Sequence, residues 1–168
     1  MRRSLILMAM VGAAGLLPLS ACNKDADAAV VVDKAKVRAD VKGDVYQLVA
    51  ALNDRNAAKA ATHDTADMVG MFHGAANTVG VDQDIATTKK IVSDPNFYLQ
   101  LGNDSVDVSD SGDMAVYRTA YSYRYTDRKT MKPAKELGNW VIGYKKQPDG
   151  AWRIAWNVVT DTGPVKPS

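Results

Sequence analysis

Cysteine and long apolar runs are scarce in this sequence. Cysteine occurs once among 168 residues, at Cys22, and histidine occurs twice. A single cysteine excludes an intrachain disulfide and a zinc site built from several thiolates. The longest apolar run, residues 5–19, is shorter than the roughly 20 residues that a membrane-spanning helix requires, and Pro18 interrupts its end. The sequence therefore predicts neither a disulfide-stabilised fold nor a membrane-spanning helix.

A surplus of charge of one sign is also absent. The chain has 21 Lys and Arg residues against 19 Asp and Glu residues. Arg2 and Arg3 lie in a segment that we expect to be removed, after which the two signs balance. Without a basic surplus we expect no nucleic-acid partner. The length suits one domain, and no internal repeat is visible.

The N-terminal residues are typical of a secretory signal. Arg2 and Arg3 supply the positive start, residues 5–19 supply the apolar segment, and Leu19-Ser20-Ala21-Cys22 follows. This last run resembles the lipobox of bacterial lipoproteins. The resemblance implies that the chain is cut before Cys22 and that its thiol receives acyl chains such as palmitate. A plain secretory signal with an incidental cysteine is the alternative.

The lipoprotein resemblance also implies a location and a division of the chain. Two or three acyl chains on Cys22 would anchor the protein stably to a membrane. Asn23 follows, and not the Asp that marks retention at the inner membrane in enteric bacteria. We therefore expect the periplasmic face of the outer membrane in a bacterial cell envelope. The expected segments are a signal peptide over 1–21, the lipidated cysteine and a tether over 22–33, one domain over 34–162 and a tail over 163–168.

The first half of the domain predicts mainly helices. Apolar residues recur there at steps of three and four, which predicts an amphipathic helix; they are Val37, Val41, Val45, Leu48 and Leu52. Asn56 is expected to cap a short helix over 57–61, and Asp82 a third helix that ends before Pro95. Between these two helices, residues 67–73 are strand-like and residues 74–77 form a turn.

The second half predicts strands. Their expected ranges are 97–101, 106–108, 114–126, 140–144 and 152–158. Gln147-Pro148-Asp149-Gly150 is expected to join the last two strands as a tight hairpin. The charged residues 124–135 are interpreted as a solvated hairpin loop. Helices followed by an antiparallel meander predict an α+β domain.

The order of these elements resembles the nuclear transport factor 2-like fold, and within it the SnoaL-like, ketosteroid-isomerase-like members. Three runs support the resemblance: Val49-Ala50-Ala51-Leu52-Asn53, then Gly80-Val81-Asp82 after a hydrophobic strand, then Gly150-Ala151-Trp152-Arg153-Ile154. It covers about residues 36–161. It implies a cone-shaped domain, with N-terminal helices packed in a curved antiparallel sheet and a pocket at the wide end.

The same resemblance permits a test of steroid isomerase chemistry. The family's oxyanion-donating tyrosine corresponds to Leu48, and its general-base aspartate falls at about Phe72. Leucine has no proton to donate to an enolate oxygen, and phenylalanine cannot accept a proton. We therefore expect no ketosteroid isomerase activity.

Two histidines remain as candidates for acid–base chemistry. His63 or His73 could transfer a proton near neutral pH, with Asp67 orienting the ring. The alternative is structural, with His63 capping the short second helix and His73 half-exposed at a strand end. The two histidines lack the close spacing of metal ligands, so we expect no metal site. We expect no cofactor either.

Aromatic residues are frequent in the predicted strands. Tyrosines 117, 121, 123 and 125 share one face of the strand over 114–126. Most of them are expected to pack in the core or at a dimer interface. Our candidates for a ligand pocket are Tyr98, Tyr121, Tyr123, Trp140 and Asn157. The alternation of residues leaves open which face of the sheet is concave.

Two functions of different classes follow. The first is a non-catalytic envelope lipoprotein whose domain binds a small apolar ligand or a protein partner, a second copy of the chain included. The second is a small acid–base enzyme, similar to a dehydratase or an isomerase, that uses a pocket histidine. We expect the first, because Leu48 and Phe72 stand at the two isomerase positions. A carboxylate–histidine pair or a Tyr–Asp pair inside the pocket would favour the second.

Overall fold

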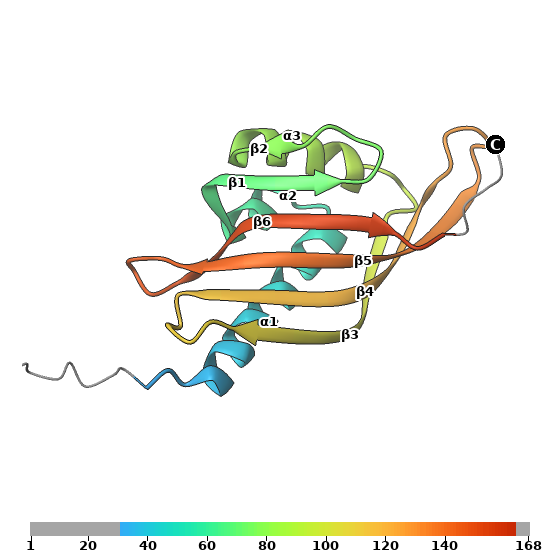
Figure 1. Ribbon diagram of the computed structural model, residues 1–168. Coiled ribbons are helices and arrows are strands. Elements are labelled where there is room, and N and C mark those ends of the chain that lie inside the picture. The colour runs from blue at the N-terminus through green and yellow to red at the C-terminus, as the bar shows by residue number, and fades with distance from the viewer. Residues whose placement is uncertain (1–30, 164–168) are drawn as a thin grey trace, which may run out of the picture.

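A computed structural model describes residues 31–163 of the chain (Figure 1). The predicted signal peptide and Cys22 lie outside the described residues. Within them, the elements in chain order are α1 (Lys34–Asn53), α2 (Ala57–Ala60), the 3₁₀ helix η1 (Ala61–His63), β1 (Asp64–Phe72), β2 (Thr78–Val79), α3 (Val81–Val92), β3 (Tyr98–Val108), β4 (Met114–Thr126), β5 (Pro133–Lys146) and β6 (Trp152–Asp161). None of the helices described is both long and apolar enough to cross a membrane.

The strands form one curved sheet in the order β2-β1-β6-β5-β4-β3 (Figure 1). Neighbouring strands are antiparallel except β1 and β6, which run parallel. The sheet is therefore mixed, and the expected antiparallel sheet is wrong at this one pair. The strands of that pair are far apart in the sequence, so local alternation of residues carries no signal for their pairing or direction.

Helix α1 packs on the concave face of the sheet and forms the core with it. Its buried residues lie on one stripe; they are Val37, Val41, Val45, Leu48 and Ala51. The predicted stripe differs at its end, where Leu52 is half-buried and Ala51 is buried instead. Opposite them, Tyr117, Ile142 and Ile154 are at most 1% exposed. The side chain of Asp33 accepts a hydrogen bond from the backbone N–H of Lys36, which caps the helix.

The inward side chains of β4 identify the concave face. Tyr117, Thr119 and Tyr121 are buried, whereas Met114 and Arg118 are exposed. The tyrosine row therefore points toward the helices. Tyr121 pairs in register with Gly138 of β5, where an added Cβ would clash with the tyrosine ring and with the carbonyl of Thr160. Glycine at this position thus makes room for an inward tyrosine.

Two element starts differ from the sequence predictions. Helix α3 begins after Gly80, whose φ of 80° favours glycine, and Asp82 lies in the first turn instead of capping the helix. Val32 packs against the core, and Asp33 caps α1. The tether predicted to extend to residue 33 therefore ends earlier, and the folded domain includes Val32.

Strands β3, β5 and β6 are longer than predicted, whereas β4 has the predicted bounds. Strand β3 is continuous, with an irregular register between Leu101 and Asp104, where the sequence predicted two strands. Strand β5 begins at Pro133, so the loop after β4 is shorter than the predicted loop over 124–135. This extension places Glu136 within a strand. The hairpin ending at Gly150, with φ of 84°, is confirmed.

Candidate functional site

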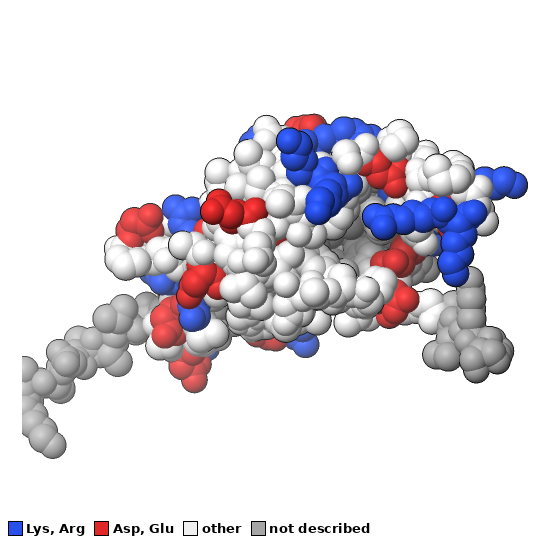
Figure 2. Space-filling view, turned by 90° about the horizontal axis from the view of Figure 1, so that it is seen from above, with Lys and Arg blue, Asp and Glu red and all other residues white. Residues whose placement is uncertain are grey.

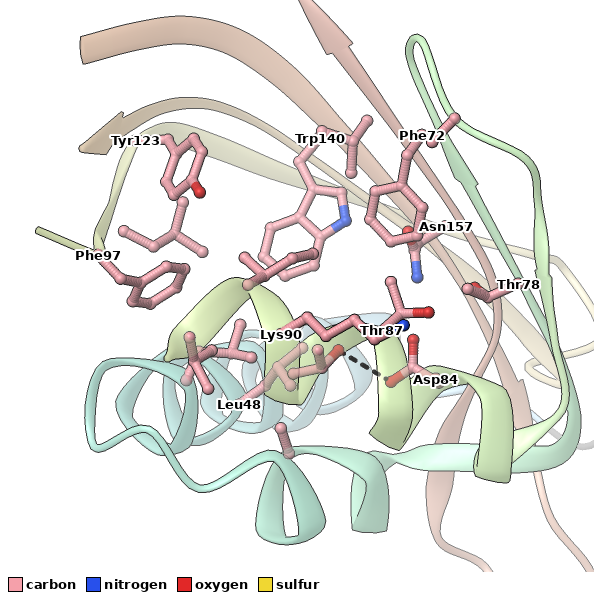
Figure 3. A pocket seen from close by; sticks show the side chains of 18 of the residues that line it. Leu48, Phe72, Thr78, Asp84, Thr87, Lys90, Phe97, Tyr123, Trp140 and Asn157 are labelled. Carbon is pink, nitrogen blue, oxygen red and sulfur yellow. Dashed lines mark hydrogen bonds between the residues drawn. The ribbon is translucent and has the colours of Figure 1, made fainter. Parts of the chain in front are cut away.

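A cavity of about 580 Å³ lies between the helices and the concave face of the sheet. Leu48 and Leu52 reach it from α1, Phe72 from β1 and Trp140 from β5. Phe97 and Tyr123 lie at one end, with ring centroids 5.6 Å apart, while Phe72 lies toward the other (Figure 3). The volume falls in the range of small-molecule sites, roughly 300–1,000 Å³.

Cationic side chains border the opening of this cavity. Lys90 of α3 and Arg128 of the loop between β4 and β5 belong to its lining, and both are exposed. Figure 2 shows a hollow in the surface of the molecule, with lysine and arginine side chains next to it. Acidic side chains also lie beside the hollow, so the apolar interior opens through a polar rim with charges of both signs.

Three buried polar atoms in the lining lack a hydrogen-bond partner. They are Thr78 Oγ1, Trp140 Nε1 and Asn157 Oδ1, and their side chains belong to residues that are 6%, 8% and 6% exposed. Asn157 and Thr78 lie near each other across from α3 (Figure 3). Leaving one such group unpaired costs about 1–3 kcal/mol. Thr65 Oγ1 is the one further atom of this kind in the described chain, and it lies outside the lining.

Two carboxyl groups face each other in the wall of the same cavity. Asp64 begins β1, Asp84 lies in the first turn of α3, and the two side chains share a hydrogen bond. Burial, reinforced by the neighbouring charges of Asp84 and Asp44, raises the pKa of Asp64 to about 8. Burial also raises the pKa of Asp84, against a lowering contribution from the Thr88 hydroxyl, which lies 3.4 Å from its Oδ2. A hydrogen bond between two carboxyl groups requires a proton on one of them, and the pKa of about 8 assigns that proton to Asp64 at neutral pH.

A second polar cluster joins β4, β5 and the residue that follows β1. The Tyr121 hydroxyl donates to Glu136 Oε1 at 2.5 Å, and His73 Nε2 lies 3.2 Å from the same oxygen. All three residues line the cavity. Burial and the hydrogen bond to Glu136 raise the pKa of Tyr121, so its proton stays in place. The carboxylate–histidine pair named above as the mark of an acid–base enzyme is therefore present.

A third cluster lies behind the cavity wall. Asp44 of α1 accepts a hydrogen bond from the Tyr144 hydroxyl at 2.8 Å and lies 2.7 Å from His63 Nδ1. His63 is 8% exposed but does not belong to the cavity lining. Burial, with the Asp44 charge as a second cause, raises the pKa of Tyr144. This cluster ties α1 to η1 and β5, and His63 has no direct access to a ligand in the cavity.

The predicted site residues divide into two groups. Tyr121, Tyr123, Trp140, Asn157 and His73 line the cavity, and so do Leu48 and Phe72. Tyr98, His63 and Asp67 do not.

The reasons for these three exclusions differ. Tyr98 is 43% exposed, and the guanidinium of Arg124 lies 4.6 Å from its ring centroid, outside the cone. Asp67 is exposed on β1 and orients neither histidine, because Asp44 and Glu136 occupy those roles. His63 points to Asp44 instead of the cavity.

Sequence reasoning missed Asp64, Asp84, Glu136 and Thr78. Glu136 is the single glutamate of the chain and follows the predicted loop over 124–135 directly, before the predicted strand over 140–144. A signal existed for Asp84, which lies four residues before Thr88 on the stripe that also contains Val92. The clusters contain carboxylates and histidines, yet residues 31–163 hold no group of three or more His, Cys, Asp or Glu side chains suited to a metal ion.

The chain is similar in structure, more than in sequence, to known proteins. No family model matches it, and no curated protein is similar to it in sequence. A hexachlorocyclohexane dehydrochlorinase from Novosphingobium barchaimii LL02 is similar, with a TM-score of 0.70, 12% identity, and coverage of 78% of this chain and 90% of that chain.

Two further solved structures have comparable likeness. A ketosteroid isomerase-like protein from Erwinia carotovora atroseptica SCRI1043 has a TM-score of 0.63 and 19% identity, over 75% of this chain and 96% of that chain. A nuclear transport factor 2-like superfamily protein from Salmonella enterica serovar Typhimurium LT2 has a TM-score of 0.64 and 14% identity, over 80% and 99%. The α+β, nuclear transport factor 2-like cone predicted from the sequence is thereby confirmed.

Proposed function

We propose that this protein is a lipid-anchored envelope protein whose cone binds a small, largely apolar ligand with a polar group at one end. The observation that supports binding most strongly is the set of three unpartnered polar atoms of Thr78, Trp140 and Asn157 in one cavity. Buried polar groups in folded proteins are normally paired. A ligand with a polar group beside Thr78 and Asn157, which lie near each other, would recover part of the desolvation cost and would orient itself in the cavity.

The remaining side chains of the cavity lining indicate which kind of molecular skeleton the ligand has. Leu48, Phe72, Phe97 and Trp140 present aliphatic and aromatic surface along the cavity. Such surface favours an apolar or aromatic skeleton, at about 25 cal/mol per Å² removed from water. The positions that steroid isomerases use for chemistry hold two of these apolar side chains, so this part of the cavity binds and does not react.

The membrane anchor is proposed from the sequence alone. The apolar segment over residues 5–19 and the lipobox-like run ending at Cys22 support lipidation at Cys22, and Asn23 supports the periplasmic face of the outer membrane. The anchor would hold the binding domain at the membrane surface, where apolar molecules partition.

Catalysis is the second candidate, favoured by the His73–Glu136 contact of 3.2 Å in the cavity lining. Glu136 is placed to stabilise the imidazolium that forms when His73 accepts a proton. In this function His73 would abstract a proton from carbon in the bound ligand. Incubation of the protein and its ligand in D₂O would then place deuterium in the ligand, and His73→Gln would prevent it. Absence of deuterium with the unmodified protein would contradict this second function.

The binding function is tested by filling the cavity. Thr87 projects into the cavity from α3 (Figure 3), whereas Ala86, its neighbour on the helix, is exposed. The full chain is purified from its host, extracted with organic solvent and the extract examined by mass spectrometry. A small molecule should accompany the unmodified protein and the control Ala86→Phe, but be depleted in Thr87→Phe. Equal extracts from all three proteins would contradict a ligand in this cavity.

A further inference from the structure

The Asp64–Asp84 pair carries a negative charge that no cation of the described chain neutralises. Neither carboxyl group takes part in any ion pair within residues 31–163. Lys90 also lines the cavity, but it contributes to the pKa of neither group. Sharing one proton leaves the pair with about one negative charge at neutral pH.

The groups packed around the pair add to this negative charge. From α1, Asp44 contributes its charge to the surroundings of Asp64. From η1 and β5, His63 and Tyr144 are already engaged with Asp44, so neither is available to Asp64. From α3, the pair receives only the Thr88 hydroxyl. A positive group that enters the cavity therefore meets an unbalanced acidic wall.

Unpartnered acceptors lie in the same region of the cavity. Asn157 and Thr78, both more than nine-tenths buried, present Oδ1 and Oγ1 without a hydrogen-bond partner. Asn157, Thr78 and Asp84 face a common part of the cavity (Figure 3). An ammonium group has three N–H donors and no acceptor, so it needs a site made of carboxylate, amide and hydroxyl oxygens.

We propose that the ligand is an amphiphilic amine, whose protonated nitrogen binds between Asp64 and Asp84 and whose apolar body lies along Leu48, Phe72 and Trp140. This proposal rests on the binding function proposed above and names its ligand class. On binding, the ammonium takes the place of the proton shared by the two carboxyl groups, and that proton leaves to solvent. No bond of the ligand forms or breaks.

A neutral ligand and an anionic ligand would each interact with the cavity differently from an amine. A neutral alcohol would hydrogen-bond to the pair and leave the shared proton in place. An anionic amphiphile would be repelled by the pair and would instead place its charge at the rim, beside Lys90 and Arg128. The affinity for each ligand and the number of protons released on binding together distinguish the amine, the alcohol and the anion.

The test uses three compounds with one skeleton: phenylbutylamine, phenylbutanol and phenylbutyric acid. Binding to the full chain in phosphatidylcholine nanodiscs is measured by titration calorimetry at pH 7, with empty nanodiscs as the blank. Repeating each titration in two buffers of different ionisation enthalpy gives the number of protons released. We expect the amine to bind about tenfold or more tightly than the alcohol. It should release close to one proton, and the alcohol none.

Substitutions at the pair separate charge from proton release. Asp64→Asn leaves a carboxylate at Asp84, so amine binding should persist while proton release is lost. The double change Asp64→Asn with Asp84→Asn should reduce amine affinity to that of the alcohol. Asp67→Asn is the matched control, because Asp67 is an exposed aspartate on the same strand outside the cavity. If the double variant does not fold, the number of protons that the unmodified protein releases on binding the amine still tests the proposal.

Equal binding of all three compounds, or amine binding without proton release, would overturn the amine assignment and leave the binding cavity standing. Tightest binding by the acid would overturn it as well, and would assign the polar end of the ligand to Lys90 and Arg128. Absence of binding by all three would instead contradict the proposed binding function itself.

Discussion

At the scale of single residues, the site depends on polar side chains at buried positions, where the periodicity of the sequence predicts apolar side chains. Asp84 is 8% exposed and shares the inward stripe of α3 with Thr88 and Val92. Its partner, Asp64, comes from β1, so the pair exists only after tertiary folding. Tyr121, Tyr123, Trp140 and Asn157 line the cavity, whereas Tyr98 does not. Strand alternation assigns residues to the two faces of a strand but does not say which face is concave. It also gives no means of predicting which carboxylates meet.

The carboxyl pair should make stability depend on pH. The pKa of Asp64 is about 8 in the folded protein against 3.8 in the unfolded chain. Between these values the folded state holds the proton more firmly, so the free energy of unfolding falls as the pH rises toward 8, by at most about 1.4 kcal/mol per pH unit. Asp64→Asn should flatten this decline, because asparagine has no such proton to lose.

Urea unfolding at a series of pH values from 5 to 9 measures the effect. Asp67→Asn should keep the slope of the unmodified protein, because its carboxylate is exposed and outside the pair. The same slope in Asp64→Asn and in the unmodified protein would show that Asp64 is not the group responsible.

Steroid isomerase activity should be absent. Leu48 and Phe72 both line the cavity, so the two positions are in place but lack the donor and the base. Loss of an oxyanion donor costs on the order of 3–4 kcal/mol, and loss of a general base a further factor of about 10² to 10⁴. A β,γ-unsaturated ketosteroid should therefore isomerise no faster with protein than in buffer, as followed by ultraviolet absorbance. Turnover that His73→Ala abolishes would contradict this and would favour the histidine enzyme.

At the scale of elements, the strongest periodicities predicted best. The apolar stripe predicted for α1 forms most of the buried face of the helix, and β4 has the predicted bounds, Met114–Thr126. The boundaries of β5 and the existence of β2 were missed. Lys135 and Glu136 are charged, which is typical of loops, yet in β5 each pairs with a residue of β4. Long-range pairing can extend a strand through residues whose local preference is weak.

The N-terminal boundary of the domain gives a prediction at this scale. A chain starting at residue 31 should melt cooperatively, whereas one starting at 34 should be about 1–2 kcal/mol less stable, because it lacks the Asp33 cap and the packing of Val32. Denaturant unfolding of the two chains measures the difference. Asp33→Ala in the longer chain serves as a control that removes the cap alone. Equal stability of the two chains would place both residues in the tether, as first expected.

At the scale of the whole molecule, the two ends of the cone have different surroundings. The first described residues lie at one end, and the loop between β4 and β5, with Arg128, lies at the opposite end (Figure 1). The hollow seen in Figure 2 is likewise displaced from the N-terminal end. The opening of the cavity thus lies away from the first described residues, the end of the domain that the proposed anchor would precede.

Lipidation at Cys22 is the prediction on which this arrangement depends. It is motivated by the short apolar segment over 5–19 and the run Leu19-Ser20-Ala21-Cys22, and it requires a thiol, because the acyl-bearing group is attached to sulfur. Protein extracted from host membranes should have an intact mass that begins at Cys22 with added diacylglyceryl. Cys22→Ser should remain uncleaved by the lipoprotein peptidase and lack the lipid, whereas Ser20→Ala, which keeps a small residue before the cysteine, should be processed normally. An unchanged mass and unchanged membrane fraction for Cys22→Ser would mean that the segment is an ordinary signal, and that the binding domain is not held at the membrane through this cysteine.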